Sequence, residues 1–130
     1  MVVVDASCLY EALVGGTVAD AVRSRLARDA ESAAPHLVDA EVLSLIRRDH
    51  VRGALDPTAS RQAVEDLRTW PGTRYGHRPL LERAFELRDA LRAWDALYIA
   101  LAEALQAPLI TLDRRLQRAT GPGCPIEVLV

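Results

Sequence analysis

The sequence has 130 residues, half of them hydrophobic and about a quarter charged, which leaves room for one globular domain with one core. The net charge of −2 argues against a strongly basic surface for nucleic acid, and no apolar run approaches the roughly 18 residues of a membrane-spanning helix. All 16 basic residues are arginine, and the absence of lysine excludes a Walker-type phosphate loop and Schiff-base catalysis.

The start of the chain and its cysteines favour a cytoplasmic protein. Met1-Val2-Val3-Val4-Asp5 lacks the basic region and the cleavage site of a signal peptide. Cys8 and Cys124 form at most one bridge, so we expect reduced thiols. No linker, repeat or low-complexity segment interrupts the chain, and we expect a single domain over residues 1–130.

The first half of the chain alternates short apolar runs with helical patterns. Val2-Val3-Val4 predicts a buried strand, and the helix that follows has Asp5 or Ser7 as its candidate cap. After Gly15-Gly16, Thr17 is expected to cap a second helix. Residues 35–38 read as a short strand or an entry segment, and Asp39 is then expected to cap the next helix.

The second half continues the alternation. Asp56-Pro57 has the pattern of a helix start. The later elements expected, in order, are an irregular or short extended stretch at 73–79, a helix at 80–87, a buried helix at 94–106, a strand at 109–112 and a last strand at 126–130. Short apolar strands separated by helices predict an α/β fold with a mainly parallel sheet.

Four acids stand at the ends of these predicted elements. Asp5 and Asp113 each follow a buried strand directly, and the carboxyl ends of parallel strands meet at one edge of a sheet. Asp95 lies at the start of the buried helix, and Glu41 lies in about the first turn of another. Helix capping is an alternative explanation for each acid taken alone, but four acids at element ends favour a shared site.

Carboxylates gathered in one site imply a cation, because burial and mutual repulsion would otherwise raise their pKa values. Oxygen ligands select Mg²⁺ or Mn²⁺, and no histidine or cysteine pair has the spacing of a zinc site. Such ions activate water for phosphodiester hydrolysis. Without these four acids the chain carries 16 basic against 14 acidic residues, which suits a weakly basic surface around an acidic pocket.

The chain resembles the PIN-domain ribonucleases, most closely the VapC-type toxins of bacterial toxin–antitoxin pairs. The resemblance covers essentially the whole chain and rests on four segments: Val2-Val3-Val4-Asp5-Ala6-Ser7, residues 35–42 (PHLVDAEV), residues 91–103 (LRAWDALYIALAE) and residues 109–116 (LITLDRRL). It implies a three-layer sandwich, a short, mainly parallel sheet flanked by helices. It also implies a Mg²⁺- or Mn²⁺-dependent endoribonuclease that inhibits translation or growth.

The resemblance assigns metal binding and catalysis to Asp5, Glu41, Asp95 and Asp113. It makes Thr111 and Ser7 candidate supporting residues, since a polar residue precedes the last acid by two positions and a small hydroxyl residue follows the first. It further implies a homodimer and a cognate VapB-type antitoxin whose C-terminal segment occupies the groove beside the acids.

Other polar and aromatic residues have two readings each. Arg92, Arg114 and Arg115 are candidate RNA contacts, and ordinary solvated arginines explain them equally well. Glu103 is either a distal acid of the site or an ion-paired surface residue. Trp94 and Tyr98 are expected in the core or in a dimer contact.

Two other functions compete with RNA cleavage. A phosphatase of the aspartyl-phosphate type wants a second aspartate two residues after the first, where this chain has Ser7, and it relies on a lysine. A degenerate domain that only binds RNA or protein is the other alternative, and the presence of all four acids argues against it.

Overall fold

Five short parallel strands form one sheet in the computed structural model, which describes residues 1–129. The strands are β1 (Val2–Val4), β2 (Ser32–Pro35), β3 (Thr73–Tyr75), β4 (Leu109–Thr111) and β5 (Ile126–Val128), in the spatial order β3-β2-β1-β4-β5. Every pairing is parallel, so the predicted mainly parallel sheet is confirmed. The last predicted strand extends to Val130, which lies outside the described residues.

The strand order creates a switch point beside β1. The chain builds outward from β1 through β2 to β3 and then returns to the other flank of β1 as β4. The connections on either side of β1 therefore leave in opposite directions, which opens a crevice at the carboxyl ends of β1 and β4. Asp5 and Asp113 follow these two strands.

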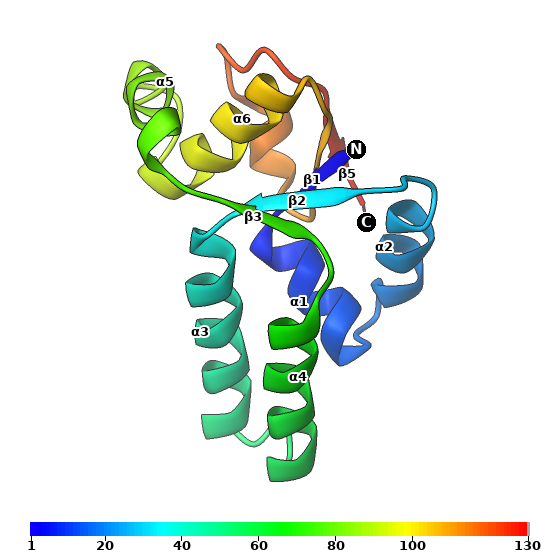
Figure 1. Ribbon diagram of the computed structural model, residues 1–130. Helices are drawn as coiled ribbons and strands as arrows, with labels where there is room; N and C mark the ends of the chain where they lie inside the picture. Colours follow the sequence, from blue (N-terminus) through cyan, green and yellow to red (C-terminus); the bar gives the residue numbers. More distant parts are fainter. Residues whose placement is uncertain (130) are drawn as a thin grey trace.

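Helices cover both faces of the sheet, which confirms the three-layer sandwich. In Figure 1 α5 (Leu81–Glu86) and α6 (Ala93–Leu105) lie on one side of the sheet. The other side carries α1 (Ala6–Val14), α3 (Leu37–Val51) and α4 (Pro57–Thr69), with α2 (Ala19–Leu26) beside α1. Two short 3₁₀ turns, η1 (Arg78–Leu80) and η2 (Arg114–Arg118), complete the fold.

The central strands and one helix form the core. Val2, Val3 and Val4 of β1 are fully buried, as expected for a central strand covered on both faces. The apolar run of α6 is buried from Ala96 to Ala102, as its sequence predicts. Asp5 follows β1 and Asp95 lies at the start of α6, so both acids are attached to buried elements of the core.

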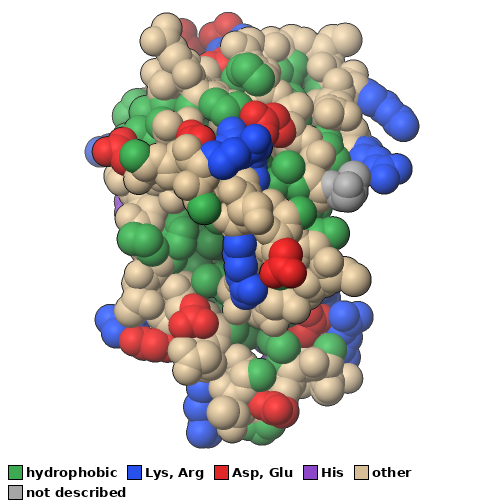
Figure 2. Space-filling model, turned by 90° about the vertical axis from the view of Figure 1, so that its right-hand side faces the viewer, with side chains coloured by type: hydrophobic (Ala, Val, Ile, Leu, Met, Phe, Trp, Pro, Cys, Tyr) green, Lys and Arg blue, Asp and Glu red, His purple; other side chains and the backbone are tan. Residues whose placement is uncertain are grey.

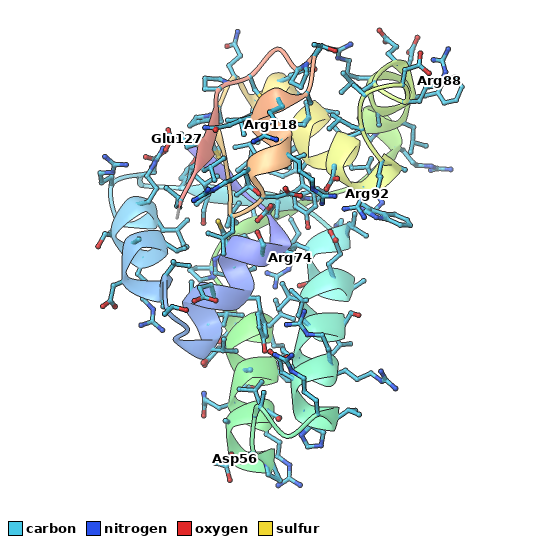
Figure 3. The ribbon with its side chains drawn as sticks, turned by 180° about the vertical axis from the view of Figure 1, so that it is seen from behind. Asp56, Arg74, Arg88, Arg92, Arg118 and Glu127 are labelled. Carbon is cyan, nitrogen blue, oxygen red and sulfur yellow. The ribbon has the colours of Figure 1, made fainter. Side chains whose placement is uncertain are left out.

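Two predicted helix starts are confirmed and two are wrong. Asp5 caps α1 by accepting a hydrogen bond from the Cys8 amide at 3.0 Å. Asp56 caps α4 at the far end of the α3–α4 hairpin (Figure 3). Thr17 does not cap α2, because the Glu11 carboxylate at the end of α1 accepts from the Val18 amide at 2.9 Å and takes that role.

Asp39 is the other corrected cap. The segment 35–38 is not a separate strand: β2 already ends at Pro35 and α3 begins at Leu37, whose amide donates to His77 Nε2 at 3.0 Å. Asp39 therefore lies inside the first turn of α3. Its carboxylate binds the Arg74 guanidinium instead, with Nε 2.8 Å from Oδ2.

The surface is mixed in charge. Figure 2 shows acidic and basic side chains interspersed among apolar ones on the face that carries α2 and β5. On that face Arg25 binds Glu127 of β5, with Nε 2.6 Å from Oε2. Cys8 and Cys124 are both free. Within residues 1–129, no helix combines the length and apolar character needed to cross a bilayer.

Candidate active site

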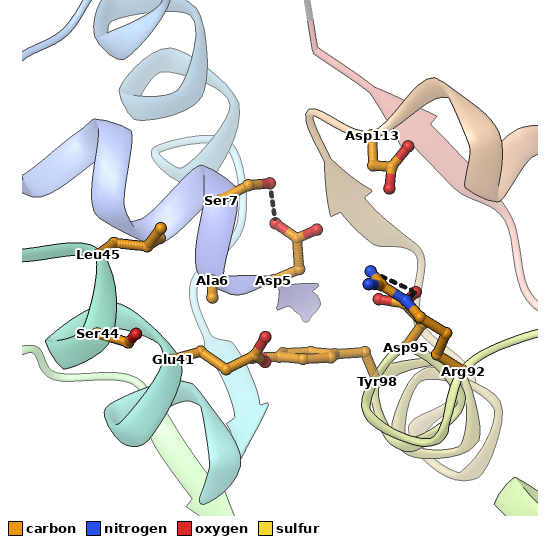
Figure 4. Close-up of a pocket in the computed structure, with 10 residues that line it drawn as sticks. All are labelled: Asp5, Ala6, Ser7, Glu41, Ser44, Leu45, Arg92, Asp95, Tyr98 and Asp113. Atoms are coloured by element: carbon orange, nitrogen blue, oxygen red, sulfur yellow. Dashed lines mark hydrogen bonds and ion pairs between the residues drawn. The ribbon is translucent and has the colours of Figure 1, made fainter. Parts of the chain in front are cut away.

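All four predicted acids line one pocket at the switch point. The cavity measures about 310 Å³, which is room for a hydrated ion and a phosphate group. Its walls come from the start of α1, the middle of α3, the start of α6 and the turn after β4 (Figure 4). The lining residues are Asp5, Ala6, Ser7, Glu41, Ser44, Leu45, Arg92, Asp95, Tyr98 and Asp113. Residues 108 positions apart in the sequence thus meet in one cavity.

Asp5 lies at the base of this pocket and is almost fully buried. Its Oδ1 accepts hydrogen bonds from Ser7 Oγ at 2.6 Å and from the Cys8 amide at 3.0 Å, and its Oδ2 accepts one from Thr111 Oγ1. Burial raises the pKa of Asp5, its hydrogen bonds with Ser7, Thr111 and Cys8 oppose that rise, and the nearby charge of Asp95 adds to it.

Two hydroxyl groups join Asp5 to the end of β4. Ser7 Oγ, which donates to Asp5, also accepts from the Leu112 amide at 3.2 Å. Thr111 Oγ1, which donates to the other oxygen of Asp5, accepts from the Asp113 amide at 3.0 Å. These two bridges fix the segment carrying Asp113 against the segment carrying Asp5. Thr111 is fully buried and acts from behind the pocket wall.

Glu41 enters the pocket from α3, where it lies in the second turn rather than the expected first turn. Tyr98 of α6 donates a hydrogen bond from its hydroxyl to Glu41 Oε1 at 2.8 Å. Burial raises the pKa of Glu41, and the charges of Asp5 and Asp95 raise it further, whereas the Tyr98 hydrogen bond lowers it. Glu41, Asp5 and Asp95 therefore form a mutually repelling group.

Asp95 reaches the pocket from the first turn of α6, but it does not cap that helix. Arg92 occupies the N-cap position without a side-chain cap, and within residues 1–129 the side-chain hydrogen bonds that Asp95 accepts come from Arg92. Both contacts, from Nε and Nη2 to Oδ2, measure 3.4 Å, so this ion pair is loose. The capping alternative is thus wrong for Asp95. Figure 4 shows the Arg92 guanidinium beside Asp95, among the side chains that line the pocket.

Asp113 stands at the rim of the pocket and is held by Arg115. It caps η2, accepting from the Arg115 amide at 2.9 Å. The Arg115 guanidinium also binds both carboxylate oxygens, with Nε 3.0 Å from Oδ1 and Nη2 2.6 Å from Oδ2. The Arg115 side chain lowers the pKa of Asp113 below its usual range, against the opposing effect of desolvation.

The donor chemistry of the pocket fits a hard divalent cation. Its four carboxylates supply only oxygen ligands, and a cation would offset the burial cost that raises the pKa of Asp5 and Glu41. In the orientations that residues 1–129 adopt, no three acidic, histidine or cysteine side chains converge closely enough to hold an ion. In these orientations Asp113 is bound to Arg115 and Glu41 to Tyr98.

Three other predicted residues fall outside the pocket or act on it indirectly. Glu103 binds Arg83, with Nε 2.7 Å from Oε1, and accepts from the Gly123 amide, so it is an ion-paired residue away from the site. Arg114 is exposed and does not line the cavity, and Arg115 contacts the pocket only through Asp113.

Sequence reasoning missed two residues of the site. Tyr98 was expected in the core or in a dimer contact, yet its buried ring carries the hydroxyl that binds Glu41. Ser44 lines the same wall one helical turn after Glu41. Its spacing of three residues on a helix would have indicated this. Trp94, also expected to be buried or in a dimer, is half exposed.

Comparison with known proteins gives consistent matches over the whole fold. Residues 2–122 match the PIN domain family. Ribonuclease VapC1 of Mycobacterium tuberculosis is 40% identical over 127 residues, covering 97% of this chain and 94% of the relative. Ribonuclease VapC3 of the same organism is 47% identical over 119 residues, covering 91% and 86%.

Among solved structures, VapBC2 from Rickettsia felis, bound to a DNA fragment from its promoter, has a similar fold. The TM-score is 0.69 at 16% identity, and the alignment covers 98% of each chain.

Proposed function

Because the chain belongs to the PIN domain family, we propose that it is a divalent-metal-dependent endoribonuclease and the toxin of a type II toxin–antitoxin pair. The relatives that cover nearly its whole length are named VapC ribonucleases, which supports RNA as the substrate class. Inhibition of translation or growth follows from RNA cleavage in the cytoplasm, where we expect the protein to act.

The observation that carries this proposal is the convergence of Asp5, Glu41 and Asp95 from three different elements on one cavity, with Asp113 at its rim. Capping of α1 explains Asp5 but not why Glu41 and Asp95, which cap no helix in residues 1–129, lie beside it and repel it. A site that binds Mg²⁺ or Mn²⁺ accounts for all of them. We therefore assign these four acids as the ligands and the catalytic residues.

The bound ion would polarise the scissile phosphate and lower the pKa of a water molecule. The chain itself supplies position and charge. Ser7 and Thr111 orient both oxygens of Asp5 and oppose its protonation, and Tyr98 does the same for one oxygen of Glu41. Arg92 lines the pocket, its side chain is 62% exposed and its contact with Asp95 is long, so its guanidinium is available to an RNA phosphate.

Two protein partners complete the proposal. The first is a VapB-type antitoxin, supported by the VapC names of the relatives and by the VapBC2 pair with the same fold. The second is another copy of the chain. Leu81, Phe85 and Trp94 are 55%, 66% and 51% exposed on α5 and the start of α6, and exposed apolar side chains of this size suit a protein contact.

RNA cleavage with matched acid variants tests the function. We expect cleavage of mixed cellular RNA in Mg²⁺ or Mn²⁺, none in EDTA, and at least a roughly 10- to 100-fold loss in Asp5→Asn, Glu41→Gln and Asp95→Asn. Asp39→Asn on the helix of Glu41 and Glu103→Gln on the helix of Asp95 are matched controls, since both acids lie outside the pocket. Cleavage that survives EDTA, or that falls equally in the controls, would contradict the proposal.

A further inference from the structure

Asp113 differs from the other three acids in its electrostatic environment. Asp5, Glu41 and Asp95 act on one another: Asp95 raises the pKa of Asp5, and both raise that of Glu41. The leading charge effects on Asp113 come instead from the guanidinium groups of Arg115 and Arg92, which lower its pKa. Asp5, Glu41 and Asp95 therefore form one cluster of acids, and the fourth acid, Asp113, is paired with the Arg115 side chain of the same chain.

The Arg115 guanidinium binds both carboxylate oxygens of Asp113. Nη2 lies 2.6 Å from Oδ2, and Nε lies 3.0 Å from Oδ1 and 3.2 Å from Oδ2. This two-point contact is the strong form of an arginine–carboxylate pair. By contrast, Arg92 holds one oxygen of Asp95 at 3.4 Å. Arg115 is thus the firmer of the two arginines on the site.

We infer that Arg115 is a built-in competitor of the divalent cation, one that holds Asp113 in the metal-free protein and must release it when an ion enters. This inference rests on the proposed metal-dependent function. Each Asp113 oxygen already accepts two hydrogen bonds from Arg115, Oδ1 from the backbone amide and Nε and Oδ2 from Nε and Nη2. A metal ion that binds either oxygen therefore competes with the guanidinium for a lone pair. The Arg115 side chain is 72% exposed, so it can swing into solvent without disturbing the core.

The exchange leaves the local fold intact. The Arg115 backbone amide donates to Asp113 Oδ1 at 2.9 Å independently of the side chain, so the cap of η2 does not need the guanidinium. The Asp113 amide also remains bound to Thr111 Oγ1. Replacement of Arg115 by glutamine should therefore free the carboxylate without unfolding the turn.

The neighbouring Arg114 provides a matched control. It is exposed and adjacent in sequence, and among residues 1–129 its side chain makes no ion pair with an acid. Arg114→Gln and Arg115→Gln remove the same charge from the same turn. Arg115 also interacts electrostatically with Asp95. A difference between the two variants in metal affinity therefore reports the position of Arg115 in the site, and an Asp113→Asn background separates its contact with Asp113 from that field effect.

Calorimetric titration of the intact protein with Mn²⁺ tests the inference. We expect Arg115→Gln to bind Mn²⁺ about three- to fivefold more tightly than Arg114→Gln, the size of effect that an exposed ion pair has. In an Asp113→Asn background the same exchange of Arg115 should change the affinity very little, because its partner is gone. Equal affinities of the two glutamine variants, or a gain that persists without Asp113, would overturn the inference.

A second measurement needs no variant. In the wild-type protein, titration with Mg²⁺ should shift the Arg115 Nε–H resonance and speed its exchange with water, while that of Arg114 stays unchanged. An Arg115 resonance that ignores Mg²⁺ at saturation would also overturn the inference. Wild-type protein that binds neither ion at millimolar concentration would instead refute the proposed metal-dependent function, on which the inference depends.

Discussion

Tyr98→Phe removes one hydroxyl group from the wall of the pocket and nothing else. The ring of Tyr98 is buried, and its hydroxyl donates to Glu41 Oε1 at 2.8 Å. Phenylalanine fills the same space, so the exchange creates no cavity. The half-buried Glu41 carboxylate loses its only side-chain donor among the described residues, while Asp5 and Asp95 continue to repel it.

The expected cost follows from that one bond. A hydrogen bond to a charged group contributes about 1.5–3 kcal/mol, and water can partly replace the donor because Glu41 is only half buried. We therefore expect a loss of about 1–1.5 kcal/mol in the free energy of unfolding, or roughly 3–6 °C in Tm. The pKa of Glu41 should rise, because the Tyr98 hydrogen bond lowers it.

Urea unfolding in EDTA measures the stability, and the pH dependence of RNA cleavage measures the pKa. The acid limb of the pH–rate profile should move to higher pH in Tyr98→Phe. Tyr75→Phe is the matched control, because the Tyr75 ring is also partly buried against the core and its hydroxyl has no hydrogen-bond partner in residues 1–129. If Tyr98→Phe and Tyr75→Phe have equal stability and the same acid limb, Tyr98 does not hold Glu41 and the argument fails.

Two further predictions concern charge. In EDTA, the free energy of unfolding should fall as pH rises above about 5, because the raised pKa values of Asp5 and Glu41 mean that the folded state binds protons more tightly than the unfolded chain there. Acids with lowered pKa values, such as Asp49 and Glu127, are largely ionised in both states at that pH and affect the slope little. Saturating Mn²⁺ should reverse that slope, and a stability that rises across this range without metal would contradict the cause given. Arg25→Ala should cost about 2–4 kcal/mol in urea unfolding, because Arg25 is buried and its loss leaves Glu127 without its partner. The exposed Arg28→Ala serves as the control, and a similar small loss in both would show that the Arg25 pair contributes little.

Local patterns in the sequence predicted most of the elements, although not β2 at Ser32–Pro35, and two of the four acids. Val2-Val3-Val4 and Leu109-Ile110-Thr111 have the short, continuous apolar character of central parallel strands, and both are fully buried. An acid directly after each strand then falls at the crevice of a parallel sheet, whatever the rest of the chain does. For Glu41 and Asp95 the residue pattern alone left a helix-capping role open. The resemblance to the PIN-domain ribonucleases was what favoured a place for them in the metal site.

Contacts between distant segments account for what the sequence did not predict. Asp39 is a residue type that often caps helices, which is why the sequence predicted a cap there. Its ion pair is with Arg74, 35 residues later on β3, and a contact over that distance leaves no local sequence pattern. Tyr98 carries no sequence feature that separates it from its apolar neighbours, because its partner Glu41 lies on another helix. Glu103 and Asp95 lie about two turns apart on α6, but Glu103 pairs with Arg83 and does not line the pocket.

The double role of Asp5 restricts which residues can occupy its position. Its side chain caps α1 and also lines the pocket, so a replacement must satisfy both folding and chemistry. Asparagine, serine and threonine can cap a helix but offer no carboxylate, and glutamate offers a carboxylate on a longer side chain that caps poorly. Aspartate combines the capping geometry with a carboxylate. A saturation library selected for folding alone should therefore retain several residues at position 5, and one selected for toxicity should retain aspartate. Glu41 and Asp95 cap no helix in residues 1–129. Selection for folding should therefore show no preference for capping residues at positions 41 and 95, and selection for toxicity should retain the acids there.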